Sequence, residues 1–120
     1  MKSMTRYSFG DVVLVPFPFS DLTQHKKRPA VIVSPRAYQQ TRPDCILLAI
    51  TGQIRSPLGY GEALVRAWRE AGLLKPSLFK PLLFTFEQSG ILRKLGSLTE
   101  SDQATLHRIL QQIIEQEAQA

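Results

Sequence analysis

The stretch Lys26-Lys27-Arg28-Pro29-Ala30-Val31-Ile32-Val33-Ser34 decides the fold, because it joins three cations to a short run of apolar residues. A β-branched run that is ended by a Ser-Pro pair is typical of a buried strand, here expected over 29–34. Pro29 is expected at the first position of this strand, where no ladder donor is needed. Arg28 is then held at the start of a rigid strand. A planar guanidinium can donate two parallel hydrogen bonds to a phosphate.

Other apolar runs predict further strands on both sides of this stretch. They lie at 12–19, 45–50, 62–65 and 78–86. Pro16 and Pro18 place the far half of the first run at an edge or a bulge, and Pro81 interrupts the last run. Residues 1–8 predict a flexible lead-in, while 91–95 carries no clear pattern.

A C-terminal helix is the clearest element of the sequence. Thr99 suits the N-cap, and Glu100 and Asp102 suit the positive end of a helix. One apolar face follows at helical spacing, formed by Leu106, Ile109, Leu110, Ile113 and Ile114. Short helical turns are expected at 36–40 and at 67–71, the second of them closed by Gly72.

Short strands without long crossover helices, followed by one helix, predict a mostly β (α+β) fold. The expected architecture is a small SH3-like antiparallel β-barrel with short helical turns and a C-terminal α-helix. With 120 residues, the chain is expected to form a single domain over 1–120 that needs no disulfide or metal to fold.

The composition indicates the compartment and the kind of partner. A net charge of +5 and a sequence pI of about 9.7 favour a polyanion such as nucleic acid. The single cysteine, Cys45, lies in an apolar run and predicts a buried thiol in a reducing, cytoplasmic setting. No run approaches the length of a membrane span, so no membrane partner is expected.

Arg28 and Thr51 form the most informative pair of polar residues. Each stands at the end of an apolar run and borders a polar loop. If the two strands are neighbours, a guanidinium and a hydroxyl converge on one pocket that suits a phosphodiester. The alternative is that Arg28 pairs with a surface carboxylate and that Thr51 is an ordinary turn residue.

Other candidates for chemistry are weaker. A metal-independent nuclease can use two histidines as base and acid, but His25 and His107 also read as a solvated loop residue and a helix residue. No His, Cys or Asp cluster has metal-ligand spacing, so neither a metal nor another cofactor is expected. Trp68 and Phe84 suit base stacking, although packing is the more common role of such residues.

The chain resembles the MazF/PemK family, the toxins of toxin–antitoxin pairs. Gly10-Asp11-Val12 is similar to the family's opening, and 27–34 to its arginine-proline strand. Ala49-Ile50-Thr51-Gly52-Gln53 is similar to its threonine-bearing strand end. The segments 71–77 and 93–98 resemble later parts of the PemK-like branch. These five segments occur in order across nearly the whole chain.

The resemblance implies a metal-independent, sequence-specific endoribonuclease that cuts single-stranded RNA and leaves 2′,3′-cyclic phosphate and 5′-hydroxyl ends. It implies a homodimer and a cognate antitoxin, with which such toxins form DNA-binding complexes. The catalytic arginine and threonine fall on Arg28 and Thr51. The expected RNA contacts are Lys26, Lys27, Gln53, Ser20 and Asp21.

Several questions stay open at the level of sequence. A guanidinium is a poor base because it stays protonated in proteins. The group that takes the proton of the 2′-hydroxyl is left open among an unusually desolvated Arg28, Asp21, His25 and water. The segment 81–84 is apolar where relatives tend to carry a polar or basic residue before the equivalent of Thr85. The rivals to the nuclease are a non-cleaving module of the same fold, such as a topoisomerase poison, and an inactive partner-binding relative.

Overall fold

The computed structural model describes residues 7–16 and 26–117. The elements follow one another as β1 (Asp11–Pro16), β2 (Lys27–Ile32), α1 (Arg36–Thr41), β3 (Asp44–Thr51), β4 (Ala63–Leu64), β5 (Leu78–Glu87), the 3₁₀ turn η1 (Gln88–Gly90), β6 (Arg93–Ser97) and α2 (Glu100–Ile113). The segment 17–25, which contains the candidates Ser20, Asp21 and His25, lies outside the described residues.

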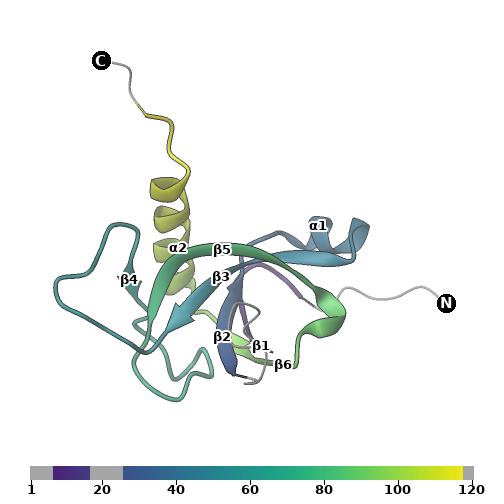
Figure 1. The fold of residues 1–120 in the computed structure, drawn as a ribbon, viewed down its shortest axis with the longest axis horizontal. Coiled ribbons are helices and arrows are strands. Elements are labelled where there is room, and N and C mark those ends of the chain that lie inside the picture. The colour runs from purple at the N-terminus through teal and green to yellow at the C-terminus, as the bar shows by residue number, and fades with distance from the viewer. Residues whose placement is uncertain (1–6, 17–25, 118–120) are drawn as a thin grey trace.

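The strands form one curled antiparallel sheet. Six strands pair in the order β4-β5-β3-β2-β1-β6, and every pair is antiparallel. Figure 1 shows β5 arching across the sheet, with α2 standing at one side and α1 at the far end of β3. The sheet is a half-barrel with β4 and β6 at its edges, and the predicted mostly β antiparallel fold with a C-terminal helix is confirmed.

Each face of the sheet carries its own apolar cluster, because successive side chains of a strand point to opposite faces. Val31 and Leu48 pack on the face that α2 covers with Leu106 and Ile109. The neighbouring Ala30, Leu47 and Cys45 belong to the second cluster, on the other face. The two clusters fix which side chains of β2 and β3 share a face.

The prediction for β2 is wrong at both ends. The strand spans Lys27–Ile32 rather than 29–34, so Pro29 is its third residue and pairs with Leu14 of β1. The missing N–H is tolerated because the β2–β3 ladder begins only at Ala30, which leaves Pro29 paired on one side. The polar residues Lys27 and Arg28 are therefore part of the strand itself.

The N-terminal expectations also need correction. Strand β1 begins at Asp11 and ends at Pro16, whereas 17–19, the rest of the predicted strand, lies outside the described residues. The flexible lead-in does not extend to Tyr7 and Ser8. Tyr7 is buried in the second cluster, and the backbone N–H of Ser8 donates to Asp11 Oδ2 at 2.9 Å.

Strand β6 is an element that the sequence pattern did not identify. It pairs with β1, and two contacts with the buried Asp11 support the pairing. Lys94 Nζ lies 3.3 Å from Asp11 Oδ1, and the Ser97 hydroxyl donates to the same oxygen at 3.1 Å. Charged residues without apolar alternation are typical of a protected edge strand, which explains why the pattern was unclear.

Strand β5 is longer than the prediction and continues through Pro81 to Glu87. The interruption expected at Pro81 appears as a change of register. Leu48 pairs with Leu83, and Ile50 pairs with Phe79. A step of two residues along β3 therefore corresponds to a step of four residues along β5. The extra residues of β5 around Pro81 form a bulge, which accommodates a residue without a backbone donor.

The predicted helical turn before Gly72 is confirmed by its hydrogen bonds. The Leu73 N–H donates to the Trp68 carbonyl at 3.0 Å, and the Gly72 N–H donates to the Arg69 carbonyl at 3.0 Å. With Gly72 at a φ of +83°, this is the Schellman pattern that ends helical segments. The turn at 36–40 is confirmed as α1 (Arg36–Thr41).

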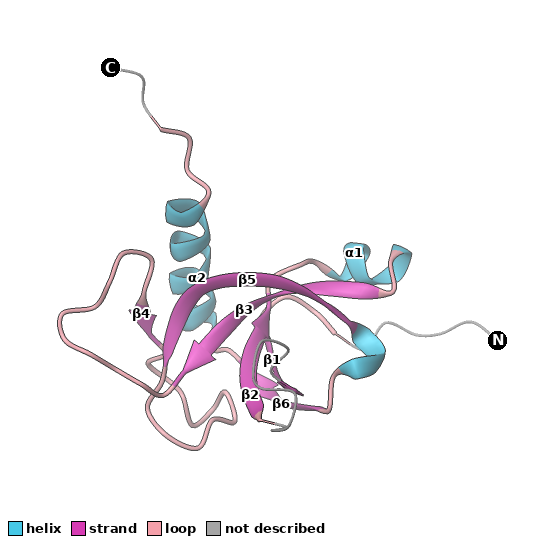
Figure 2. Ribbon diagram, viewed as in Figure 1, coloured by secondary structure: helices cyan, strands magenta, loops and turns pink. Residues whose placement is uncertain are grey.

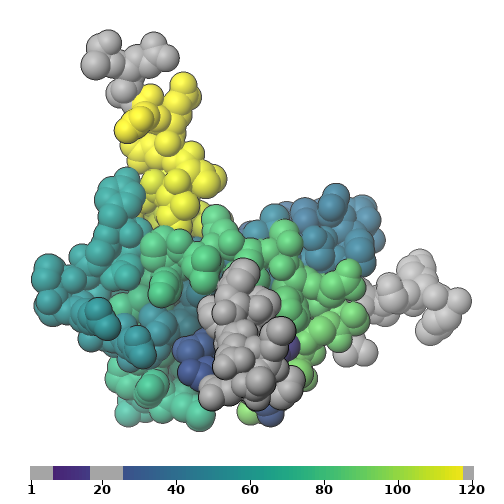
Figure 3. All heavy atoms as spheres, in the orientation of Figure 1, coloured from purple at the N-terminus to yellow at the C-terminus, as the bar shows by residue number. Residues whose placement is uncertain are grey.

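The prediction for α2 is confirmed at its start and wrong at its last turn. Thr99 is the N-cap, and its hydroxyl accepts from the Asp102 N–H at 3.2 Å. Leu106 and Ile109 are buried, but Ile114 is 72% exposed because the helix ends at Ile113 and the chain turns away from the sheet. Figure 3 shows this end of α2, in yellow, projecting from the body of the molecule.

Candidate active site

The register of the sheet relates Arg28 to Thr51. Ala30 of β2 pairs with Ala49 of β3 in an antiparallel ladder. The paired residues end at Ala30 and Ala49, and counting on by two residues along each strand aligns Arg28 with Thr51. Opposed residues of an antiparallel pair point to the same face, here the face that carries the second apolar cluster. The guanidinium and the hydroxyl thus stand on one face at the adjoining ends of two strands.

Thr51 uses its hydroxyl oxygen to shape the chain that follows β3. Thr51 Oγ1 accepts a hydrogen bond from the Gln53 N–H at 3.1 Å. This contact is the turn that the alternative interpretation of Thr51 predicts. It uses the oxygen as an acceptor, and a hydroxyl in that arrangement can still donate its proton to another oxygen. Thr51 is half-buried, so it is partly open to solvent.

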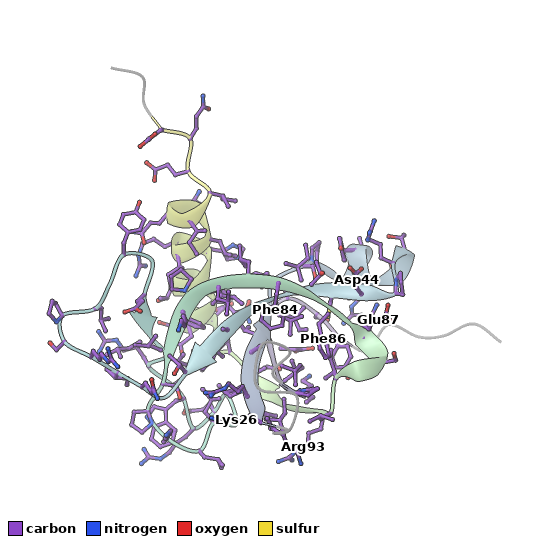
Figure 4. All side chains as sticks on the ribbon, in the orientation of Figure 1. Lys26, Asp44, Phe84, Phe86, Glu87 and Arg93 are labelled. Carbon is purple, nitrogen blue, oxygen red and sulfur yellow. The ribbon has the colours of Figure 1, made fainter. Side chains whose placement is uncertain are left out.

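Two further basic residues flank Arg28 in the chain. Lys26 and Lys27 are exposed, whereas Arg28 is half-buried because it lies inside β2 and pairs with Val15 of β1. Figure 4 shows Lys26 in the same part of the molecule as Arg93 of β6. The structure therefore brings Lys26, Lys27 and Arg28 to one end of the sheet. Gln53 is exposed just beyond Thr51, so it borders the same end.

Acidic side chains gather at a different part of the sheet. Asp44 and Glu87 pair with each other across β3 and β5. Figure 4 shows both near α1, away from Lys26 and Arg93. Arg42 lies beside the Asp44 carboxylate at 3.3 Å. Basic side chains therefore mark the Arg28 end of the sheet, and the carboxylates of Asp44 and Glu87 lie elsewhere on it.

Three other candidates from the sequence, His107, Trp68 and Phe84, have packing contacts of their own. His107 stacks on Phe9 with 4.5 Å between ring centroids, which gives it a packing role on α2. Trp68 lies under the Arg69 guanidinium at 4.4 Å, and Phe84 packs against the second apolar cluster. These positions agree with packing roles for the three side chains.

The donor chemistry of the described residues bears on metals and on nucleophilic thiols. Within 7–16 and 26–117, no group of three or more His, Cys, Asp or Glu side chains is placed to hold a metal ion. Cys45 is fully buried, and burial, with a smaller contribution from the Asp44 carboxylate, raises the pKa of its thiol to about 11. The predicted buried thiol is confirmed, and a protonated thiol is a poor nucleophile.

A lysine that the sequence analysis did not single out lies beside Gly52, the residue that follows Thr51. The side chain of Lys75 runs over Gly52, so closely that a Cβ at position 52 would collide with Lys75 Cε. The two residues are far apart in sequence and meet because β5 begins opposite the end of β3, with Leu78 paired to Thr51. No local sequence pattern predicts this contact.

The fold and the basic strand ends define a class, the small half-barrel proteins to which MazF toxins belong. The chain matches the family model for PemK-like, MazF-like toxins of type II toxin–antitoxin systems over residues 8–114. This chain therefore belongs to that family, as its resemblance in sequence implied.

Solved structures share the fold over most of the chain. A mycobacterial endoribonuclease in complex with its cognate antitoxin has a TM-score of 0.75 and 14% identity, covering 95% of this chain and 100% of its own. MazE–MazF from Deinococcus radiodurans has a TM-score of 0.72 and 15% identity, and the match covers 92% of this chain and 98% of that structure. The Mycobacterium tuberculosis toxin MazF-mt6 has a TM-score of 0.69 and 18% identity, and the match covers 90% of this chain and 99% of that structure.

No curated protein sequence matches this chain. Across the part of the chain that the structure describes, no helix is long and apolar enough to cross a membrane.

Proposed function

We propose that this chain is the toxin of a toxin–antitoxin pair and a metal-independent, sequence-specific endoribonuclease. It cuts single-stranded RNA, leaves 2′,3′-cyclic phosphate and 5′-hydroxyl ends, and so inhibits growth. The observation that carries the proposal is the pairing of Ala30 with Ala49, because the same register, counted on by two residues, aligns Arg28 with Thr51. The similarity in fold to a mycobacterial endoribonuclease supports it.

The chemistry of the proposed reaction uses the substrate's own nucleophile. The 2′-oxygen forms a bond to the adjacent phosphorus, and the bond from phosphorus to the 5′-oxygen breaks. The 2′-hydroxyl loses a proton, and the departing 5′-oxygen gains one. Arg28 stabilises the charge that builds on the phosphoryl oxygens, and the Thr51 hydroxyl donates a hydrogen bond to one of them.

Arg28 is not a good proton acceptor, because a guanidinium keeps its proton in proteins. The acceptor in the proposed reaction is therefore water or a side chain of the loop before β2, in which the sequence offers Asp21 and His25. Lys26, Lys27, Gln53, Ser20 and Asp21 are proposed to bind the RNA on either side of the scissile bond.

Protein partners follow from the same proposal. The similar structures include a mycobacterial endoribonuclease with its cognate antitoxin and MazE–MazF from Deinococcus radiodurans. We therefore infer that this chain binds a cognate antitoxin and that it forms a homodimer. An antitoxin with an acidic segment suits the positive end of the sheet, where it competes with RNA.

The test is cleavage of a mixed-sequence RNA by the purified chain in excess EDTA, with analysis of the product ends. The parent protein is expected to make discrete cuts that end in cyclic phosphate. Arg28→Ala is expected to abolish them, and Thr51→Val is expected to reduce them, because valine has the shape of threonine without its hydroxyl. Arg36→Ala, which removes an exposed arginine from α1, is the control and is expected to cut normally.

Two outcomes would contradict the proposal. Cleavage that persists in the Arg28→Ala protein would remove Arg28 from the reaction. A folded parent that makes no cuts would show that the chain is not a nuclease under these conditions and would favour a toxin that acts by binding alone. Inhibition of growth by the Arg28→Ala protein would then support the binding module over an inactive relative.

A further inference from the structure

Lys75 extends the basic end of the sheet beyond the Arg28–Thr51 pair. A Cβ built on Gly52 would lie 3.1 Å from Lys75 Nζ and 3.1 Å from its Cδ, and would collide with Cε. The methylene chain of Lys75 therefore lies along the backbone of Gly52. Because neighbouring Cα atoms are about 3.8 Å apart, the amine lies within about 9 Å of the Cα of Thr51.

The backbone around Lys75 is fixed, which limits where its side chain can reach. Pro76 has a fixed φ and restricts the backbone of Lys75 before it, and the Ser77 hydroxyl donates to the Lys75 carbonyl at 2.9 Å. Ser77 is buried, and its own carbonyl accepts from the Val65 N–H at 2.9 Å. Figure 2 shows the loops that leave β3 and enter β5 at the same end of the sheet.

Lys75 is exposed, and among the described residues no carboxylate forms an ion pair with its amine. The ion pairs among residues 7–16 and 26–117 are Arg42 with Asp44 and Lys94 with Asp11. An ammonium group has three donors and no acceptor, so its natural ligand at this position is an anion. The flexible stem suits a point contact with a phosphate rather than the recognition of a base.

We propose that Lys75 binds a backbone phosphate of the RNA next to the phosphate held by Arg28 and Thr51, and that Gly52 lets the lysine side chain lie where it can do so. This inference rests on the proposed ribonuclease function, and it adds a positioning residue to that site. The contact is independent of sequence, so it raises affinity for every RNA and places the strand across the end of β3.

The test measures binding of the full chain to a single-stranded, mixed-sequence RNA that carries 2′-O-methyl groups, which remove the attacking hydroxyl. Affinity is measured by fluorescence anisotropy at several salt concentrations. Lys75→Met is expected to weaken binding about threefold to tenfold at low salt. It is also expected to reduce the slope of log affinity against log salt by about 0.7, the value for one lost contact with a single strand.

Four more variants separate the local contact from a general effect of charge. Lys75→Arg is expected to keep the parent's slope, because it keeps the cation. Arg108→Gln removes one charge from an exposed position of α2, which packs on the opposite face of the sheet. This variant is also expected to keep the parent's salt slope. Gly52→Ala is expected to weaken binding by displacing Lys75, and the double variant with Lys75→Met should bind no worse than Lys75→Met alone.

The outcomes distinguish this inference from the proposed function. A parent-like slope for Lys75→Met, or an equal loss for Arg108→Gln, would overturn the role of Lys75 even if the parent cuts unmodified RNA. A loss specific to Lys75 in a chain that does not cut unmodified RNA would support the phosphate contact and overturn the nuclease. A folded parent that does not bind the RNA at all would overturn both.

Discussion

Ala30 of β2 pairs with Ala49 of β3, and this pairing determines how Arg28 and Thr51 face each other. Both alanines are buried, so little space is available for a shift of one strand along the other. A slip by one residue would turn Arg28 and Thr51 to opposite faces. The buried pairs of β2 and β3 therefore fix the register on which the proposed site depends.

A change of Arg28 to lysine tests whether the geometry of the guanidinium matters beyond its charge. Arg28→Lys keeps the positive charge but loses the planar fork that holds two phosphate oxygens. The rate of RNA cleavage is expected to fall by about 100-fold, while the melting temperature stays near that of the parent.

The control for this prediction is Arg36→Lys on α1. Arg36 is exposed, and its guanidinium donates to Ser8 Oγ at 2.7 Å. This substitution makes the same chemical change away from the strand ends and is expected to leave the cleavage rate unaffected. Equal rates for Arg28→Lys and the parent would mean that a charge alone suffices at position 28.

The sequence predicted local features of the fold better than long-range ones. The start of α2 could be predicted because the Thr99 cap and the following apolar spacing act within a few residues. The start of β2 could not, because tolerance of Pro29 depends on where the β3 ladder ends. Strand β6 exists through its pairing with β1 and through Asp11, neither of which is visible in the residues of β6 itself.

The same division applies to the candidate site. Arg28 and Thr51 could be proposed because each stands at the end of an apolar run. Their relation required the register, which the sequence does not contain. Lys75 was not proposed, since its contact with Gly52 is produced by the path of the chain between β3 and β5. Interactions between distant segments are therefore the part of the site that only the structure provides.

A buried carboxylate on α2 is expected to contribute strongly to stability. Asp102 is completely buried, and its two oxygens accept from the backbone N–H groups of Arg66 at 3.1 Å and Ala67 at 2.9 Å. Asp102→Ala leaves both donors without an acceptor and is expected to lower the free energy of unfolding by about 3 kcal/mol. Urea denaturation measures the change. Glu100→Ala, an exposed change in the same helical turn, should cost less than about 0.5 kcal/mol.

Gly72 is expected to tolerate no side chain. Its φ of +83° is unfavourable for other residues, and a Cβ there would collide with the Leu95 carbonyl oxygen of β6. Gly72→Ala is expected to lower the free energy of unfolding by more than about 2 kcal/mol. Gly59→Ala is the matched control, because its Cβ would meet only the Glu62 carboxylate at an ordinary 3.4 Å. Similar urea midpoints for the two variants would contradict this account.

The buried thiol of Cys45 predicts how stability depends on pH. The pKa of Cys45 is raised from an ordinary 9.0 to about 11, because burial penalises the thiolate and the Asp44 carboxylate repels it. The folded chain thus holds the thiol proton more tightly than the unfolded chain does. This contribution is fully present below pH 9 and is lost as the pH rises from 9 to 11, and it amounts to about 3 kcal/mol.

The measurement compares the parent with Cys45→Ala by urea denaturation between pH 8 and 11. Lysines and tyrosines that titrate in the same range affect both proteins, so the difference between them isolates the thiol. The parent's advantage is expected to shrink as the pH rises, because only the parent then has to accommodate a buried thiolate. Two curves that stay parallel to pH 11 would show that the thiol keeps an ordinary affinity for its proton in spite of its burial.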